Sequence, residues 1–442
     1  MKAISVPLLW KWSVRDLRQR WMQVVGVSII IALGVAVFSG LGSAAPWRTK
    51  SLDESYAMLN MHDVKLALTP GSYLDAERLS QAIRSVSHAD WVEEVDLRLN
   101  VATSVNASTP DQSVLVSGQL IGVSAQPSGG PVVNRLHATS GRALEASDAG
   151  EPVCVVEHNF ATYYDLEPGD RSIQVRGGYT LEPVGNAISP EHFMVIEEES
   201  GALGIMAQER LAVLFVPLET TQEIAGLPGM VNEALITVPA GLGEEELDQL
   251  KAELEDAMAQ AFPQVGLRLE KRSENRVYRI LYDDIPGDQE MFDTFAFILL
   301  LGAAFGAFIL IGRIVDAQRR EIGINMALGV PRVRIACRYL LVSAQIALLG
   351  MALGMVLGLL INQPMGELIS QMIPTPYFES PLQPEVFLRG ALIGLVVPFL
   401  AVLYPIWRAV RVPPIDAIQT GYLVSKGGGL APLLARSPLG RG

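Results

Sequence analysis

The sequence predicts an α-helical membrane protein with four transmembrane helices and one large α+β domain outside the cytoplasm. Three observations support this fold class. Half of the 442 residues are hydrophobic. Four stretches carry no charged side chain and are long enough to cross the roughly 30 Å hydrocarbon core of a bilayer as helices. Residues 51–290 hold 39 acidic and 15 basic side chains, whereas the rest of the chain holds 8 acidic and 19 basic. One acidic domain is therefore set apart from a basic remainder.

The uncharged stretches and their flanking charges predict the topology. Spans are expected over 21–47, 294–312, 339–362 and 389–407, the last containing Pro398. Basic residues cluster before the first span, between the second and third, and after the fourth. Because Lys and Arg are enriched in cytoplasmic loops, both termini are predicted to be cytoplasmic. The remaining segments are then an outer domain (48–293), a cytoplasmic loop (313–338), a short outer loop (363–388) and a cytoplasmic tail (408–442).

Residues 1–20 precede the first span and have their own pattern. Trp10, Val14, Leu17 and Trp21 recur at helical spacing, and the other face holds basic residues: Lys11, Arg15, Arg18 and Arg20. This spacing predicts an amphipathic helix at the membrane surface, although the segment could also be only the charged end of the first span. Ser43-Ala44-Ala45 resembles a signal-peptide cleavage site, but the apolar run before it is too long for a signal peptide. We therefore expect the first span to be retained.

The outer domain contains a weak internal repeat. Residues 63–99 and 231–270 each have the pattern of a strand, a helix and a second strand. Two such βαβ units predict a porter-like, ferredoxin-like module with strands 63–69 and 231–238 in one sheet. A β-rich insertion is expected over 105–230. Its candidate strands are 112–118, 152–157, 171–176, 192–197 and 211–216. Residues 274–293 predict a helix broken near Pro286-Gly287.

The segment after the second span is both basic and patterned. It holds six arginines against only Asp316 and Glu321; the arginines are Arg313, Arg319, Arg320, Arg332, Arg334 and Arg338. Ile322, Met326 and Leu328 alternate with polar positions before a Gly329-Val330-Pro331 break. This pattern predicts a short amphipathic helix that turns back to the membrane. An ordinary positively charged loop is the alternative that composition alone leaves open.

Small residues at four-residue spacing mark three of the spans. They are Gly302 and Gly306, then Gly350, Gly354 and Gly358, then Gly390 and Gly394. Such rows let helix backbones approach closely, so these helices are expected to pack on protein. No ionisable Asp, Glu, Lys or Arg lies inside the uncharged stretches, which argues against an ion-coupled carrier.

Several classes of chemistry lack their sequence signatures. There is no Gly-x-x-x-x-Gly-Lys-Ser/Thr loop for ATP phosphates and no Gly-x-Ser-x-Gly nucleophile motif. The five histidines have no metal-ligand spacing, and Cys154 and Cys337 fall on opposite sides of the predicted membrane. The acidic domain argues against nucleic acid. We therefore expect no catalytic residue, no metal site and no cofactor bound by this chain.

Residues 319–335, RREIGINMALGVPRVRI, resemble the cytoplasmic motif of the FtsX/MacB-like (type VII) ABC transporter permeases. Residues 140–170 resemble part of the family's periplasmic core domain, and 404–421 its closing segment. In that family the motif forms a coupling helix that rests on a separate ATPase. The resemblance implies this role for Arg319, Arg320, Glu321, Gly323, Ala327, Gly329, Pro331 and Arg332.

The resemblance also implies a function. Such permeases transmit the motion of an ATPase, which binds ATP and Mg²⁺, across the bacterial inner membrane to a periplasmic domain that exports or extracts an envelope substrate. Their expected partners are the ATPase, a second permease in a homodimer or heterodimer, membrane lipid and, in some branches, a periplasmic adaptor. Some relatives carry a second set of spans. The alternative within the family is a non-transporting scaffold or sensor that activates an envelope enzyme.

Overall fold

The computed structural model describes residues 6–108, 113–126, 129–195 and 209–411. The chain forms two compact units. We call the first the helical unit; it comprises Met1–Ala44, Asp288–Met365 and Pro381–Gly442. The second, the α/β unit, comprises Ala45–Gly287 and Gly366–Ser380. Both cysteines are free, Cys154 buried in the α/β unit and Cys337 exposed in the helical unit.

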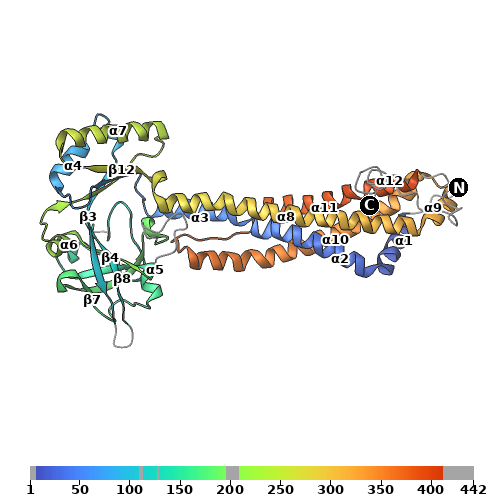
Figure 1. The fold of residues 1–442 in the computed structure, drawn as a ribbon, viewed down its shortest axis with the longest axis horizontal. Coiled ribbons are helices and arrows are strands. Elements are labelled where there is room, and N and C mark those ends of the chain that lie inside the picture. The colour runs from blue at the N-terminus through green and yellow to red at the C-terminus, as the bar shows by residue number, and fades with distance from the viewer. Residues whose placement is uncertain (1–5, 109–112, 127–128, 196–208, 412–442) are drawn as a thin grey trace, which may run out of the picture. The chain divides into compact units, whose positions relative to one another are not determined.

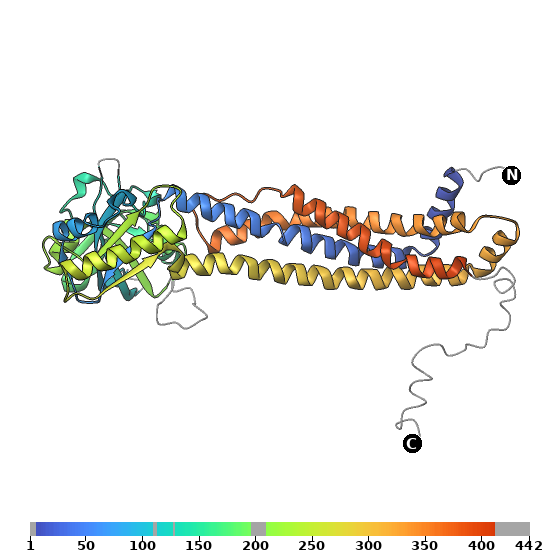
Figure 2. The same cartoon turned by 90° about the horizontal axis from the view of Figure 1, so that it is seen from above.

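The structure confirms the prediction of four long apolar helices. Those long enough to cross a membrane are Trp21–Met58, Arg276–Ala317, Arg332–Met372 and Pro384–Val410. Their parts within Ala45–Gly287 and Gly366–Ser380 belong to the α/β unit. Within them lie α2 (Trp21–Ala36), a π-helical turn (Val37–Leu41), α3 (Ala44–Met58), α8 (Arg276–Ala317), α10 (Arg332–Met372), α11 (Pro384–Ala401) and α12 (Leu403–Val410). Two shorter helices, α1 (Val6–Gln19) and α9 (Arg319–Ala327), also belong to the helical unit. The long helices run side by side, as Figure 1 and Figure 2 show.

Glycine rows on α10 and α11 face α2 at close range. A Cβ atom added to Gly350 would lie 2.6 Å from the Ile31 Cβ, and one added to Gly354 would lie 2.6 Å from the Val35 Cβ. Gly358, Gly390 and Gly394 also leave no room for a Cβ beside α2 and its π-helical turn. Gly302 and Gly306 on α8 are less confined, since their added Cβ atoms would lie 4.0 and 3.3 Å from the nearest side chains. The α10 row lies against backbone atoms of α2 and its π-helical turn, whereas the α11 row lies against their side chains.

Two expected helix boundaries are wrong. α8 is one helix with Pro286 inside it, so the break predicted at Pro286-Gly287 is absent. Its buried residues Leu281, Ile285 and Phe292 bracket the proline, and this packing offsets the one backbone hydrogen bond that proline removes. α10 continues through Pro364 to Met372, and α11 starts at Pro384, so the loop predicted over 363–388 is shorter. The prediction ended this span ahead of Glu367, but a helix can continue past the uncharged stretch.

The repeat in the α/β unit forms the expected ferredoxin-like module. Its strands are β1 (Val64–Leu68), β3 (Glu94–Asn106), β11 (Glu233–Thr237) and β12 (Leu267–Lys271), in the sheet order β12-β1-β11-β3. β1 pairs with β11 through Val64 and Ile236, which confirms that the two repeats share a sheet. α4 (Ala76–Arg84) and α7 (Glu244–Ala261) bury Leu79, Leu250 and Leu254 against it. α7 begins with three glutamates, whose charge suits a helix N-terminus.

β3 continues beyond this module and carries the insertion. Its strands are β4 (Leu115–Val123), β5 (His137–Gly141), β6 (Val153–Glu157), β7 (Ile173–Val175), β8 (Thr180–Ile188) and β9 (Leu211–Pro217). The candidates at 152–157, 171–176 and 211–216 contain observed strands, and 112–118 overlaps β4 with residue 112 outside the described residues. The candidate at 192–197 is wrong over its described part, where a 3-10 turn spans Pro190–His192. β8 escaped prediction because Pro183 and Gly185 interrupt its alternation.

A coupling segment and two charged sites

The helix predicted after the second span is present as α9. Gln318 alone separates α8 from α9, and α9 ends before Gly329. Gly329 has a φ of +83°, in the left-handed region that favours glycine. The Gly329 N–H donates to the Met326 carbonyl at 3.0 Å, and the Val330 N–H donates to the Asn325 carbonyl at 3.0 Å. α10 begins directly after Pro331. Gly329 and Pro331 therefore set the reversal of the chain.

The residues proposed for coupling differ in their exposure to solvent. Arg320, Glu321, Ala327, Gly329, Pro331 and Arg332 are exposed, whereas Gly323 is buried and Arg319 is partly buried. Leu328 and Val333 flank the turn and expose 74% and 73% of their surface, the largest fractions among the exposed apolar residues of the described chain. We call this surface the turn face; it consists of Arg320, Ile324, Ala327, Leu328, Arg332, Val333 and Arg334. It is an apolar tip surrounded by arginines.

A buried ion pair braces the turn face, and sequence reasoning missed it. Asp16 of α1 and Arg338 of α10 are 2% and 6% exposed, and two Arg338 nitrogens donate to the Asp16 carboxylate at 2.7 and 3.0 Å. Gln318 donates to Asp16 at 3.2 Å and accepts from the Tyr339 hydroxyl at 2.8 Å. We call these four residues the brace. The only signal in the sequence was one acidic residue in an otherwise basic N-terminal segment.

A groove lies between α8, α9 and α12, on the other side of α9 from the exposed positions. It encloses about 300 Å³. Its charged lining is Arg313, Asp316, Arg319 and Arg408, and its apolar lining includes Phe308, Ile309 and Tyr404. Arg319 therefore points into this groove rather than onto the turn face. Its Nε atom is buried without a hydrogen-bond partner among the described residues. We call this feature the arginine groove.

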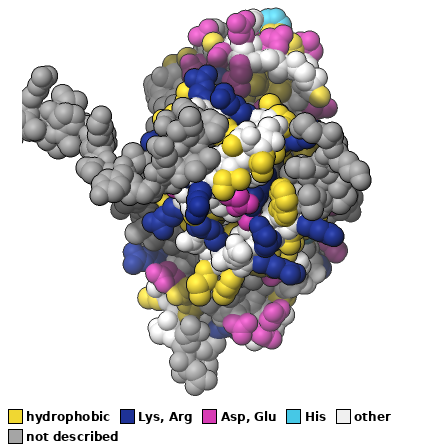
Figure 3. All heavy atoms as spheres, turned by 90° about the vertical axis from the view of Figure 1, so that its right-hand side faces the viewer, with side chains coloured by type: hydrophobic (Ala, Val, Ile, Leu, Met, Phe, Trp, Pro, Cys, Tyr) yellow, Lys and Arg dark blue, Asp and Glu magenta, His cyan; other side chains and the backbone are white. Residues whose placement is uncertain are grey.

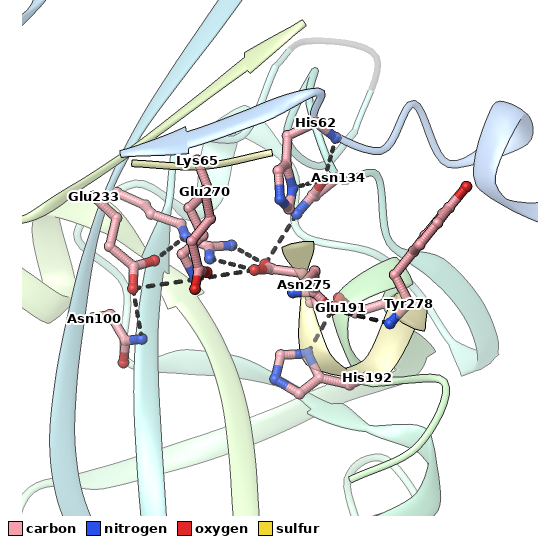
Figure 4. Close-up of polar contacts among 12 residues, drawn as sticks. His62, Lys65, Asn100, Asn134, Glu191, His192, Glu233, Glu270, Asn275 and Tyr278 are labelled. Carbon is pink, nitrogen blue, oxygen red and sulfur yellow. Dashed lines mark hydrogen bonds and ion pairs between the residues drawn. The ribbon is translucent and has the colours of Figure 1, made fainter. Parts of the chain in front are cut away.

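The α/β unit holds a different charged site, shown in Figure 4. Arg98 of β3 donates to Glu233 of β11 at 2.5 Å and to both carboxylate oxygens of Glu191 at 2.5 and 2.9 Å. Lys65 of β1 lies 3.1 Å from Glu191 and 3.5 Å from Glu233. We call these four residues the charge cluster. Because Glu191 comes from the insertion and the others come from the ferredoxin-like module, the cluster fastens the two parts together.

Electrostatics show that the charge cluster is internally neutral. Burial alone would raise the pKa of Glu191, but the charges of Arg98 and Lys65 outweigh burial and hold that pKa well below its usual range. Burial lowers the pKa of neighbouring His62 and His192 to about 4, so both imidazoles are neutral at pH 7. Two cations thus face two anions, with no free charge to act on a substrate. Across the described residues, no three His, Cys, Asp or Glu side chains are grouped to hold a metal ion.

Comparison with known proteins finds a family match for the C-terminal part of the chain. Residues 294–414 match the family described as FtsX-like permease C-terminal. The chain is 24% identical, over 285 residues, to the ABC transporter permease protein Rv0987 of Mycobacterium tuberculosis (strain ATCC 25618 / H37Rv). The match covers 62% of this chain and only 30% of that relative's length.

Two solved structures match about half of the chain. One is the periplasmic region of MacB from Actinobacillus actinomycetemcomitans, with 10% identity and a TM-score of 0.34, covering 53% of this chain and 97% of that one. The other is the extracellular domain of the ABC-type transporter YknZ from Gram-positive bacteria, with 13% identity and a TM-score of 0.32, covering 47% and 99%. The family match spans α9, the turn face and the arginine groove. By this match and by the motif that begins at Arg319, residues 294–414 belong to the family described as FtsX-like permease C-terminal.

Proposed function

We propose that this chain is the membrane subunit of an ABC transporter and that it transmits the motion of a separate ATPase to the α/β unit. The turn face is the observation that carries the proposal. Leu328 and Val333 are exposed apolar side chains at the apex of a tight turn, and arginines surround them. A surface of this kind suits a protein partner with an apolar pocket and an acidic rim. ATP and Mg²⁺ would bind to that partner, since this chain has no phosphate-binding loop.

The brace gives the turn face a mechanical connection. α9 is joined to α8 through Gln318, and Gln318 contacts both Asp16 and Tyr339. Arg338 lies in the second turn of α10 and is held by Asp16 with charge-assisted hydrogen bonds. A push on the turn face is therefore transferred to α1, α8 and α10 together. α8 and α10 each contribute residues to both units, so they are the elements that would carry the motion onward.

Orientation follows from charge. Figure 3 looks onto the end of the helical unit, where Lys and Arg side chains gather around apolar ones. An excess of these residues beside membrane spans marks the cytoplasmic side. In this proposal the turn face and both termini lie in the cytoplasm, and the acidic α/β unit lies outside the bacterial inner membrane. There the α/β unit would export or extract an envelope substrate, with a second permease chain completing the transporter and a periplasmic adaptor as a further partner.

Binding of the ATPase tests the proposal. The Leu328→Asp/Val333→Asp variant puts two carboxylates on the apolar tip, and we expect it to lose co-purification with a co-expressed candidate ATPase. The matched control is Leu115→Asp, because Leu115 is also exposed, at 69%, but belongs to the α/β unit. The control should retain the ATPase at the wild-type level. Retention of the ATPase by the double variant, at a normal membrane level, would contradict the proposed docking surface.

A further inference from the structure

We propose that the arginine groove binds the phosphate headgroup of an anionic phospholipid. This inference is separate from the docking of an ATPase, because the groove and the turn face use different residues. It concerns the space of about 300 Å³ between α8, α9 and α12. Three kinds of observation carry it: the charge of the lining, an unmet hydrogen-bond donor, and the apolar wall.

The charges of the groove do not neutralise one another. Arg313, Arg319 and Arg408 face a single carboxylate, Asp316. Among the described residues none of these four side chains forms an ion pair, whereas Arg338, one helix away, is fully paired with Asp16. Guanidinium groups match the geometry of phosphate oxygens and bind them with paired hydrogen bonds. The groove thus presents a net positive charge of the right chemical kind for a phosphate.

Arg319 shows where the phosphate would be bound. Its Nε atom is shielded from solvent and has no acceptor among the described residues. A buried polar group left without a partner is unfavourable, so such groups are rare unless a ligand or water satisfies them. An oxygen of a bound phosphate in the groove would accept this hydrogen bond. Arg408 and Arg313 line the same space and would hold the remaining charge.

The apolar wall favours a lipid over a soluble anion. Phe308 and Ile309 precede Arg313 by about one helical turn, inside the uncharged stretch of α8. Tyr404 stacks on Phe308 with ring centroids 6.3 Å apart, and Arg411 lies 4.2 Å from the centre of the Trp407 ring. Phe305, Leu400 and Leu403 extend this exposed apolar surface, with 61%, 56% and 40% exposure. The groove therefore has a charged end and an apolar end, as a headgroup with its acyl chains requires.

Binding of defined lipids to the purified full-length protein in detergent tests the site. We expect phosphatidylglycerol to bind and phosphatidylcholine to bind at least tenfold more weakly, measured by native mass spectrometry. The Arg319→Gln/Arg408→Gln variant should lose phosphatidylglycerol binding at least tenfold. Arg332→Gln/Arg334→Gln removes the same charge from the turn face and serves as the matched control, with binding within twofold of wild type.

A variant that binds the lipid more tightly distinguishes a specific site from a loss of binding caused by misfolding. Asp316→Asn removes the opposing carboxylate and should strengthen phosphatidylglycerol binding several-fold, which an unfolded protein cannot mimic. Three results would overturn the proposal. The first is equal binding of phosphatidylglycerol by the groove variant and its control. The second is displacement of the lipid by millimolar inorganic phosphate, which would indicate a site for free phosphate, and the third is displacement by the ATPase, which would indicate a protein-docking groove.

Discussion

The charge cluster of the α/β unit and the arginine groove of the helical unit differ in how their arginine side chains are hydrogen-bonded. Arg98 is 4% exposed, and its guanidinium donates to two carboxylates. Arg319 is also partly enclosed, yet its Nε donates to no described group. A buried ion that is fully paired has satisfied its bonding within the fold. A buried ion without a partner can still form a hydrogen bond with another molecule. The comparison therefore distinguishes charges that stabilise the fold from charges that are available to bind a ligand.

Removing one member of the charge cluster should have the largest effect on stability. Glu191→Ala leaves Arg98 and Lys65 buried against Glu233 alone, and we expect a loss of about 3–5 kcal/mol in the free energy of unfolding. Denaturant unfolding of the purified protein, followed by α/β-unit fluorescence or circular dichroism, measures it. The double variant Arg98→Met/Glu191→Leu removes one charge of each sign and should be less destabilised than the single variant. A Glu191→Ala protein within 1 kcal/mol of wild type would show that the cluster does not hold the insertion in place.

Breaking the brace is expected to come next. Asp16→Ala leaves the buried Arg338 without its carboxylate partner. We expect this change to lower the free energy of unfolding of the helical unit by about 2–4 kcal/mol and to speed tryptic cleavage after Arg320 and Arg332. Glu321→Gln is the control, because Glu321 lies 3.6 Å from Arg338 but its side chain is 53% exposed, and such contacts contribute about 0–1 kcal/mol. Equal cleavage rates in the two variants would mean that the ion pair does not order α9 and the turn that follows it.

The histidines beside the charge cluster predict how stability depends on pH. Their pKa values are about 4 in the fold, against about 6.5 when unfolded, so the unfolded chain binds more protons between these values. Stability should therefore fall as pH drops from about 6.5 towards 4, by roughly 2 kcal/mol for each histidine at pH 5. Burial raises the pKa of Glu157 to about 7, and this carboxyl acts in the opposite direction between pH 7 and 4.5.

A single substitution isolates the histidine contribution. His62→Gln should flatten the decline in unfolding free energy between pH 7 and pH 5 by roughly 2 kcal/mol, because glutamine takes up no proton there. An identical pH profile for His62→Gln and wild type would show that His62 is not held neutral by burial.

The smallest expected effect on the free energy of unfolding is that of a substitution in the arginine groove. Arg408→Gln should change the free energy of unfolding by less than about 0.5 kcal/mol, since Arg408 is exposed and has no ion pair among the described residues. The same unfolding measurement, made in lipid-free detergent, checks it. A loss comparable to that of Glu191→Ala would indicate that Arg408 serves the fold, and the distinction between the two sites would fail.

The sequence determined the outline of both units but not their charged contacts. Uncharged stretches define the four long helices because a bilayer excludes charge. The repeat predicted that strands 63–69 and 231–238 share a sheet, and in the structure Val64 pairs with Ile236. The brace could not be predicted, since Asp16 and Arg338 are 322 residues apart and each resembles an ordinary surface charge in the sequence. Glu191 was likewise hidden, because the residues that follow it have the pattern of a strand.

The orientation of Arg319 could not be predicted either. The motif identifies the residue, but its direction depends on how α12 packs against α8, and the spacing of apolar residues along one helix does not specify its neighbour. Pro286 shows the opposite limit, in which a strong local signal for a break is overridden by packing on both sides of it.

Stimulated ATP hydrolysis by a reconstituted complex of this chain with its proposed ATPase tests the central claim most directly. Gly329 has a φ of +83° and open space around it, so Gly329→Trp strains the turn and adds bulk to the turn face without touching the α/β unit. We predict that the complex with this variant loses stimulated hydrolysis while the protein keeps its membrane level and its α/β fold. Full ATPase binding and full stimulation by Gly329→Trp would contradict the role of the turn face in coupling.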